Sequence, residues 1–360
     1  MEVHVAGGEA SVHMLGRSRL SADEPLIRTF RLGMPHTPTQ VDPEDGEVLS
    51  RITALFCANH TRHRPQQYAF DRSVAERVVK NVSENRERLW FIPGERRCFE
   101  AVCSVELKKD QRSLTSRVSL YVGDGFTSVA QLEELLLTAV AASASRGRKI
   151  VHLTFEDVTF GTLLEKCGFT RRSNALELYV DLKSVEYLEQ STSRSHIRLV
   201  DFEGRCPEKY LRDYCALKTL INQSARGDRQ SDEHVISPAW TRAEERCAEI
   251  RETPYCGTLA IDRYGGVIGL SDLRLFTPNG RCAMWEDTVV RPDWRNYGLA
   301  AQLKAACLRR LLTTQPTITH VGTLNNERNL PILALNRKFG FRCLLPVPKW
   351  EYLAQGFPAS

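Results

Sequence analysis

The sequence contains no run of about 18 apolar residues, so we expect no transmembrane helix. Residues 1–25 lack the apolar segment of a secretory signal peptide, and we interpret them as a flexible tail. The 11 cysteines are scattered, with no C-x-x-C pair and no zinc-like Cys/His spacing. These absences argue against a membrane protein and against a metal site. They favour a cytoplasmic protein whose cysteines are buried free thiols.

Neither sign of charge dominates the chain, whose formal net charge is +5. Residues 1–194 carry equal numbers of basic and acidic side chains, so the whole positive excess lies in residues 195–360. This excess is small for a dedicated nucleic-acid-binding protein, but it suits a site for an anionic ligand. The composition is that of a soluble globular protein, and 360 residues suggest two domains.

The chain repeats its order of elements. The tripeptide AQL occurs at 130–132 and again at 301–303, each time within a helical pattern, and Gly-Phe follows at 168–169 and 340–341. Strand-like runs and an opening helix stand in the same order in both halves. Alternating strands and helices of this kind predict an α/β (α+β) unit that occurs twice in the chain.

We therefore divide the chain into a tail, two domains and a linker. The polar run EQSTSRS marks the linker. The predicted boundaries are 1–25 for the tail, 26–188 for the first domain, 189–195 for the linker and 196–360 for the second domain.

The stretch RPDWRNYGLA, residues 291–300, leads into a helix that has no Ser, Thr or Asp at its cap position. The predicted core-facing stripe of this helix is Leu299, Leu303, Cys307 and Leu311, while Gln302, Lys304, Arg309 and Arg310 are predicted to point elsewhere. Gly298 allows a ligand to approach the backbone closely. Free N–H groups and the helix dipole at such a start predict a cradle for a phosphate.

The corresponding helix of the first half is predicted to cap itself. Ser128 and Gln131 match a capping box, and Glu133 and Glu134 are expected to place two carboxylates in the first turn. When the AQL tripeptides are aligned, the opposed residues are Asp124 and Arg295, Gly125 and Asn296, Thr127 and Gly298, and Val129 and Ala300. Acidic side chains repel a phosphate, so the first half is predicted to keep the fold and to lack the phosphate site.

The segment VVRPDWRNYGLAAQL resembles the acetyl-CoA-binding motif of the GNAT superfamily of N-acetyltransferases, R/Q-x-x-G-x-G/A. The motif reads here from Arg295 to Ala300. The run TLNNERNLPILALNRKFGF is similar to the closing strand, helix and Gly-Phe turn of that family. The resemblance is strong over 255–345, weaker over 195–254, and covers 26–185 as a degenerate copy. It implies two tandem GNAT folds, each a mixed, mostly antiparallel sheet flanked by helices, an arrangement that mycothiol synthase also shows.

The resemblance implies an acyl-CoA co-substrate, most simply acetyl-CoA, and no metal. The backbone of Val289 and Val290 is expected to pair with the pantetheine arm, and Asn329 is expected to contact the cofactor. The expected pyrophosphate-binding residues are Arg295, Asn296, Tyr297, Gly298, Leu299 and Ala300. The family's general-acid tyrosine has no counterpart, since no tyrosine lies between Asn329 and Phe341.

A general base must take a proton from the attacking ammonium, and two carboxylates precede the cradle. Strand alternation predicts Glu286 on one face with Met284 and Thr288, and Asp287 on the other with Trp285 and Val289. Members of the superfamily often place a glutamate base on this strand, so Glu286 is preferred. A purely structural role for either acid stays open.

Three functions fit these observations. The leading prediction is an N-acyltransferase that moves an acyl group from CoA to a small-molecule amine, in antibiotic resistance or specialised metabolism. The alternative is a GNAT-fold transferase that takes its acyl group from aminoacyl-tRNA. The third is a non-enzymatic binding protein that retains a CoA site. No membrane partner is expected, and the chain is expected to be a monomer or a homodimer.

Overall fold

The computed structural model describes residues 37–62, 64, 71–94, 99–110, 113–155, 157–185, 196–224, 235–276 and 281–354. All of them belong to one compact unit, Pro35–Ser360. The predicted tail at 1–25, the first residues of the predicted first domain and the linker at 189–195 lie outside the described residues.

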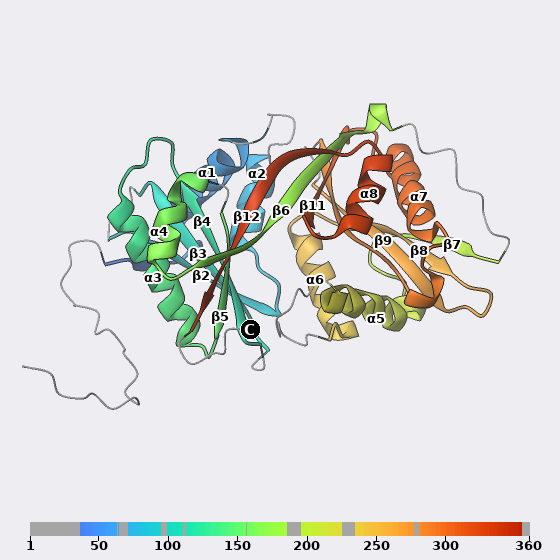
Figure 1. Ribbon diagram of the computed structural model, residues 1–360, viewed down its shortest axis with the longest axis horizontal. Coiled ribbons are helices and arrows are strands. Elements are labelled where there is room, and N and C mark those ends of the chain that lie inside the picture. Colours follow the sequence, from blue (N-terminus) through green and yellow to red (C-terminus); the bar gives the residue numbers. More distant parts are fainter. Residues whose placement is uncertain are drawn as a thin grey trace, which may run out of the picture. The chain divides into compact units, whose positions relative to one another are not determined.

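The first half builds a sheet with helices on both faces (Figure 1). Its elements are β1 (Thr39–Val41), α1 (Gly46–Arg62), α2 (Arg72–Lys80), β2 (Arg86–Ile92), β3 (Ala101–Lys108), β4 (Thr115–Val122), α3 (Val129–Ala144), β5 (Ile150–Thr154), α4 (Gly161–Lys166) and β6 (Thr170–Asp181). Side chains of α1 and α2 form one core with the sheet, and those of α3 and α4 form another on the opposite face.

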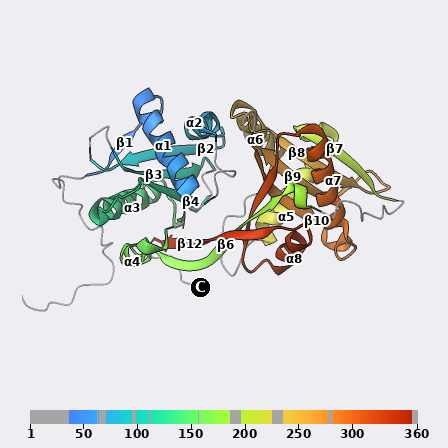
Figure 2. The ribbon, with the colours of Figure 1, turned by 90° about the horizontal axis from the view of Figure 1, so that it is seen from above.

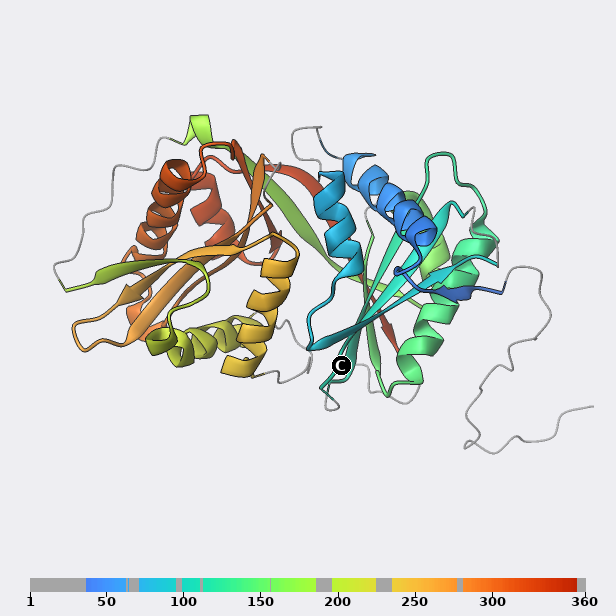
Figure 3. The same cartoon turned by 180° about the vertical axis from the view of Figure 1, so that it is seen from behind.

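The second half repeats this order, as the sequence predicted. Its elements are β7 (Arg198–Gly204), α5 (Glu208–Ser224), α6 (Pro238–Ile250), β8 (Tyr255–Ile261), β9 (Val267–Leu275), β10 (Cys282–Val290), α7 (Leu299–Thr314), β11 (His320–Asn326), α8 (Leu330–Lys338) and β12 (Arg342–Leu353). Side chains of α5 pack on one face of the sheet, and those of α7 and α8 pack on the other. Seen from behind in Figure 3, α1 and α2 cover the first half's strands.

The strands form one 12-stranded sheet in the order β1-β2-β3-β4-β5-β12-β6-β11-β10-β9-β8-β7. The pairing is antiparallel except for β4 with β5 and β10 with β11. The predicted fold class, a mixed and mostly antiparallel α/β sheet flanked by helices, is therefore confirmed.

The two halves exchange their last strands. Strand β6, from the first half, pairs with β11 of the second, and β12, from the end of the chain, pairs with β5 of the first. The exchanged strands β6 and β12 also pair with each other, and Figure 2 shows them side by side. Leu178 and Val180 of β6 consequently lie in the core of the second half, and Trp350 of β12 lies in that of the first.

A buried ion pair anchors the exchanged strand β6 to the first half. Arg64, which follows α1, donates to both carboxylate oxygens of Glu177, at 2.6 and 2.5 Å. Both side chains are only 6% exposed. A charge pair withdrawn this far from water is costly to break, because the remaining partner keeps a buried, unpaired charge.

Within the described residues, no helix is long and apolar enough to cross a membrane. The predicted burial of cysteine holds for most of the thiols. Nine of the ten cysteines in the described part of the chain are buried or half-buried, and all ten are free. The exception is Cys343, which is exposed near the start of β12.

Candidate functional site

Strands β10 and β11 run parallel and then separate. Their pairing begins at Cys282 with His320 and ends at Trp285 with Thr323. Beyond that point β10 pairs with β9 alone, as far as Val290 with Gly269. The N–H of Arg291 donates to the carbonyl of Ile268 on β9. Because the backbone groups of successive residues in an antiparallel strand point alternately to either side, those of Val290 point away from β9, into the opening between β10 and β11. The separation leaves strand edges to which an extended ligand could bind.

A β-bulge lies where the two strands begin to separate. Trp285 pairs with Leu273 and Asp287 with Asp272, so Glu286 is the extra residue of β10. The bulge changes the predicted faces. Asp287 and Val289 both face α5, as expected. Trp285 faces α7 instead. Thr288 lies on the same face as Trp285, because both side chains bond to the hydroxyl of Ser271. The predicted face of Asp287 with Trp285 is therefore wrong, because simple alternation does not allow for an inserted residue.

Glu286 is held at the edge of the bulge by an arginine. Its Oε1 lies 3.2 Å from Nε of Arg274 on β9, and its side chain is 35% exposed. Arg274 also donates to the hydroxyl of Tyr255, at 2.7 Å. Burial alone would lower the pKa of Arg274, but Glu286 and Tyr255 raise it above its ordinary value. Glu286 is thus a positioned carboxylate that solvent or a substrate can reach.

Asp287 belongs to a buried network that was not predicted from the sequence. Its carboxylate pairs with Nζ of Lys218 on α5, and its N–H bonds to Asp272 at 3.0 Å. Asp272 is fully buried and also accepts from Lys218 and from Tyr214, both at 2.7 Å. Burial opposes the charge of Lys218, but Asp272 and Asp287 outweigh this and raise its pKa. The signal in the sequence was a carboxylate, Asp272, inside the mostly apolar run VIGLSDLRL.

The loop between β10 and α7 contains two residues in the left-handed conformation. Asn296 has φ 67° and Gly298 has φ 78°. Gly298 is the N-cap of α7, and no side chain of the described residues caps the helix, as predicted. A Cβ placed on Gly298 would meet no described atom within 4 Å. The first N–H groups of the helix therefore have no side-chain cap, and the space beside Gly298 is open.

The β11 side of the opening carries two asparagines. Asn336 of α8 is 1% exposed and donates from Nδ2 to Asn325 of β11 at 2.6 Å. Its own Oδ1 is buried and has no hydrogen-bond partner within the described part of the chain. Asn329 is the N-cap of α8 and accepts from the N–H of Ile332 at 3.5 Å. Asn336 stands near the position of the absent tyrosine, and local sequence patterns did not predict that its side chain would be buried.

Lys304 was predicted to point away from the core, and this is wrong. It is 1% exposed, and its Nζ lies 3.4 Å from the ring centroid of Trp285 and 4.9 Å from that of Phe341. It forms no ion pair with any described residue. Burial lowers its pKa well below the ordinary value. The predicted stripe residues Leu299, Leu303, Cys307 and Leu311 are all buried, but Lys304 shares their core.

The first half has the same separation of parallel strands but differs in detail. Strands β4 and β5 pair from Thr115 with Ile150 to Val118 with Leu153. The pairing of β3 with β4 continues to Val122 without a shift in register, so Glu286 has no counterpart there. Six residues, 123–128, join β4 to α3, whereas eight, 291–298, join β10 to α7.

The predicted self-capping of α3 is wrong. Ser128 is the N-cap, but its side chain makes no capping hydrogen bond to the described chain. Glu133 and Glu134 also lie beyond the first turn, because the helix begins at Val129. Asp124 does lie before the helix, where Arg62 binds it at 2.7 Å.

Comparisons with known proteins address the fold. A scan of the sequence against models of protein families gives no match, and a search of curated sequences gives no relative. Solved structures do match. A tandem GNAT protein from the clavulanic acid biosynthesis pathway has a TM-score of 0.74 and 18% identity, covering 90% of this chain and 100% of its own. A GCN5-related N-acetyltransferase from Sphaerobacter thermophilus has a TM-score of 0.62 and 14% identity, covering 90% and 98%.

A third match is a glucosamine N-acetyltransferase region in a fungal multi-domain β-N-acetylglucosaminidase. Its TM-score is 0.58 with 12% identity, and the match covers 89% of this chain and 38% of that one. At these sequence identities, the structural matches show the fold. This chain has the tandem GNAT fold.

Proposed function

We propose that the second half transfers an acyl group, in the first instance acetyl, from a CoA thioester to the amine of a small molecule. One observation supports this most directly. The separated ends of β10 and β11, the bulge at Glu286 and the uncapped start of α7 lie together at the carboxyl ends of the parallel strands.

The residues present fit such a ligand. The space around Gly298 suits a pyrophosphate, and the N–H groups from Arg295 to Ala300 would hold it with the help of the helix dipole. The backbone of Val290 would bind a pantetheine amide, whereas the same alternation points the backbone groups of Val289, which was also predicted to pair with this arm, toward β9. Asn329 would contact the cofactor from the start of α8.

The chemistry then needs few groups. A CoA thioester supplies an activated acyl carbon and a weakly basic leaving thiolate. Glu286 would accept a proton from the substrate ammonium, which frees the amine to attack the acyl carbon, and Arg274 would hold Glu286 in position. Asp287 is the second candidate for this role, although it is bound by Lys218. Backbone N–H groups of the open strand edge would stabilise the oxyanion.

The test is direct. Acetyl-CoA binding is measured by calorimetry, and release of free thiol is then followed with a panel of primary amines. Turnover with at least one amine would support the proposal. Aminoacyl-tRNA is tested in parallel as the alternative donor by following transfer of a labelled amino acid to the amine, because its ester releases a tRNA hydroxyl and no thiol. Tight binding of acetyl-CoA with no turnover in any assay would favour a non-enzymatic CoA-binding protein.

A further inference from the structure

Arg274, which holds the proposed base Glu286, uses little of its hydrogen-bonding capacity. A guanidinium presents several N–H donors in a planar fork. Within the described residues, Arg274 makes one hydrogen bond, from Nη2 to the hydroxyl of Tyr255 at 2.7 Å. Its Nε lies 3.2 Å from Oε1 of Glu286 but forms no hydrogen bond to any described residue. The side chain is 23% exposed, so N–H groups of Arg274 remain for a ligand beside Glu286.

Tyr255 adds a second donor at the same place. Tyr255 and Arg274 are directly opposed on β8 and β9, so both side chains lie on one face of the sheet. Cζ of Arg274 lies 5.0 Å from the centroid of the Tyr255 ring. The hydroxyl accepts from Arg274, and within the described chain its own hydrogen has no acceptor. An O–H group and a guanidinium side by side suit a carboxylate, which accepts several hydrogen bonds.

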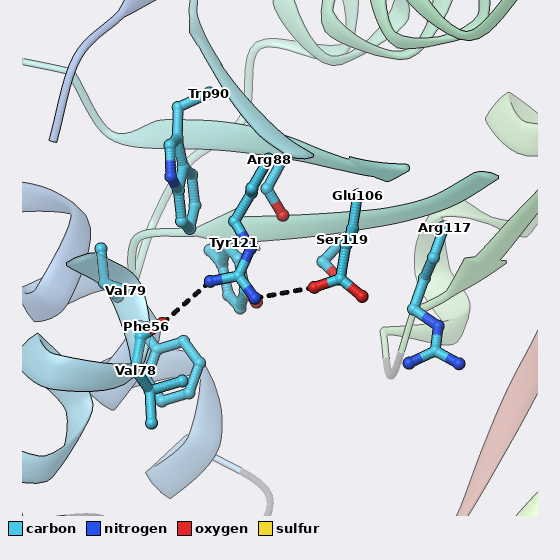
Figure 4. Close-up of a pocket in the computed structure, with 10 residues that line it drawn as sticks. Phe56, Val78, Val79, Arg88, Trp90, Glu106, Arg117, Ser119 and Tyr121 are labelled. Atoms are coloured by element: carbon cyan, nitrogen blue, oxygen red, sulfur yellow. Dashed lines mark hydrogen bonds and ion pairs between the residues drawn. The ribbon is translucent and has the colours of Figure 1, made fainter. Parts of the chain in front are cut away.

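A further cation near Arg274 lacks a counter-ion. Arg251, which follows α6, donates to the carbonyl of Asn81 at 2.9 Å and forms no ion pair with a described residue. Burial lowers the pKa of Arg251, and its neighbours Arg88 and Arg274 lower it further. Arg88 is itself neutralised by Glu106, which accepts from it at 2.8 Å (Figure 4). The charge of Arg251 therefore favours a ligand that brings a negative group to Arg274.

The proposed reaction removes the counter-ion of Arg274. Glu286 becomes neutral when it accepts a proton from the substrate ammonium. Glu244 also stabilises the charge of Arg274, but it is bound by Arg86 at 3.4 Å. A guanidinium that is mostly withdrawn from water is costly to leave unpaired. A carboxylate on the substrate would take the place of Glu286 and keep Arg274 neutralised while the amine attacks.

We propose that the acyl acceptor is a small amino acid, with its ammonium on Glu286 and its carboxylate on Arg274 and Tyr255. In this arrangement each charge lies next to charges of the opposite sign. Oε1 of Glu286 and Nε of Arg274 are 3.2 Å apart, so the two groups of the substrate must also be close, as in an α- or β-amino acid. The inference rests on the proposed acyl transfer and narrows its acceptor from amines to amino acids.

Matched acceptors test the role of the carboxylate. The probes are the standard amino acids and β-alanine, each compared with its primary amide and with the amine that lacks the carboxyl group. The amide lowers the basicity of the amine and the decarboxylated compound raises it, so a preference for the acid over both cannot come from basicity. With acetyl-CoA as donor, we expect kcat/KM to be at least about tenfold higher for the amino acid than for either analogue.

Tyr255→Phe tests the proposed contact, because it removes the O–H group and keeps the ring. We expect kcat/KM for the preferred amino acid to fall about tenfold, mainly through KM, with little change for its two analogues. Tyr264→Phe is the matched control. Arg263 donates to the Tyr264 hydroxyl at 2.6 Å and lies over its ring, as Arg274 does at Tyr255, but Tyr264 is 80% exposed. Tyr264→Phe should change none of these values, and thermal unfolding checks the fold of both variants.

The inference is overturned if an analogue is acetylated as well as its amino acid, or if Tyr255→Phe slows all three compounds equally. Acetylation of other amines but of no amino acid would also overturn it, and would leave the proposed acyl transfer standing. Failure to bind acetyl-CoA, or binding without acetylation of any amine, would instead contradict the proposed function and this inference together.

Discussion

Glu286 and Asp287 are adjacent in sequence, yet cations on different elements hold their carboxylates. Oε1 of Glu286 lies 3.2 Å from Nε of Arg274 on β9, whereas the carboxylate of Asp287 pairs with Lys218 on α5. Lys218 also holds Asp272, so Asp287 is part of a buried network. Glu286 stands at the bulge and remains accessible. The two acids can therefore be distinguished by experiment.

Glu286→Gln should lower turnover by about 10²–10⁴-fold, the usual contribution of a general base. The change keeps the size of the side chain and removes its basicity. Affinity for acetyl-CoA should stay within about twofold, or ~0.4 kcal/mol. Steady-state kinetics across pH give the sharper test, because the acid limb of the wild-type profile should shift or disappear. A fully active variant with an unchanged profile would show that the base lies elsewhere.

Asp287→Asn should act mainly on stability. It removes one of the two carboxylates that hold Lys218, and we expect the free energy of unfolding to fall by about 1.5–3 kcal/mol. Urea unfolding measures this, and turnover should fall less than in Glu286→Gln. If Asp287→Asn abolishes turnover in a stable protein while Glu286→Gln does not, the two roles are exchanged.

Lys304→Met should stabilise the protein. The amine of Lys304 is buried against Trp285 and Phe341 without a described ion-pair partner, and the two rings offset only part of the desolvation of a charge. We expect a gain of about 1–3 kcal/mol at pH 7 in urea unfolding.

The gain should depend on pH in a defined direction. Burial lowers the pKa of Lys304 in the folded state, so the unfolded chain binds a proton that the folded chain does not. Wild-type stability relative to Lys304→Met should therefore rise with pH up to the unfolded pKa, about 10.4. A difference that stays constant from pH 7 to pH 10 would contradict this.

Glu177→Gln should destabilise the chain by about 3 kcal/mol, because Arg64 would lose the carboxylate that neutralises its buried charge. The pair between Arg205 and Glu249 has a similar distance, 2.7 Å, but is exposed. Glu249→Gln is therefore the control, with an expected change below about 0.5 kcal/mol. Equal effects in thermal or urea unfolding would show that the Arg64 pair does not anchor β6.

The order of elements could be predicted because the halves repeat it, and apolar periodicity marks each helix and strand locally. The exchange of β6 and β12 could not be predicted, because the partner of a strand is set by tertiary pairing and not by the residues of the strand alone. Local signals also missed the burial of Lys304. Its position on α7 is polar by residue type, and only the tertiary contact with Trp285 makes it part of the core.

The site was predicted in part. The uncapped start of α7 followed from the residues that precede it, and Gly298 occupies the predicted position. The bulge at Glu286 could not be predicted, because a bulge depends on the register with β9 and leaves no mark in the residues of β10. The network of Asp287, Lys218 and Asp272 joins three elements that are distant in sequence, and no spacing rule connects them.

Gly298→Asp should abolish acetyl-CoA binding and leave the fold intact. The new carboxylate would occupy the proposed pyrophosphate position and repel it. Gly125 of the first half is the matched control, because it has the same φ of 78° and a Cβ there would also meet no described atom within 4 Å. Backbone strain of about 1–3 kcal/mol is therefore shared by both variants, and any difference in binding comes from the site.

The central claim is that the second half binds a CoA thioester and the first half does not. Calorimetric titration of acetyl-CoA into the wild type, Gly298→Asp and Gly125→Asp tests it most directly. We expect one site per chain in the wild type, one in Gly125→Asp and none in Gly298→Asp. Two equal sites in the wild type, or binding that survives in Gly298→Asp within about twofold, would contradict the claim.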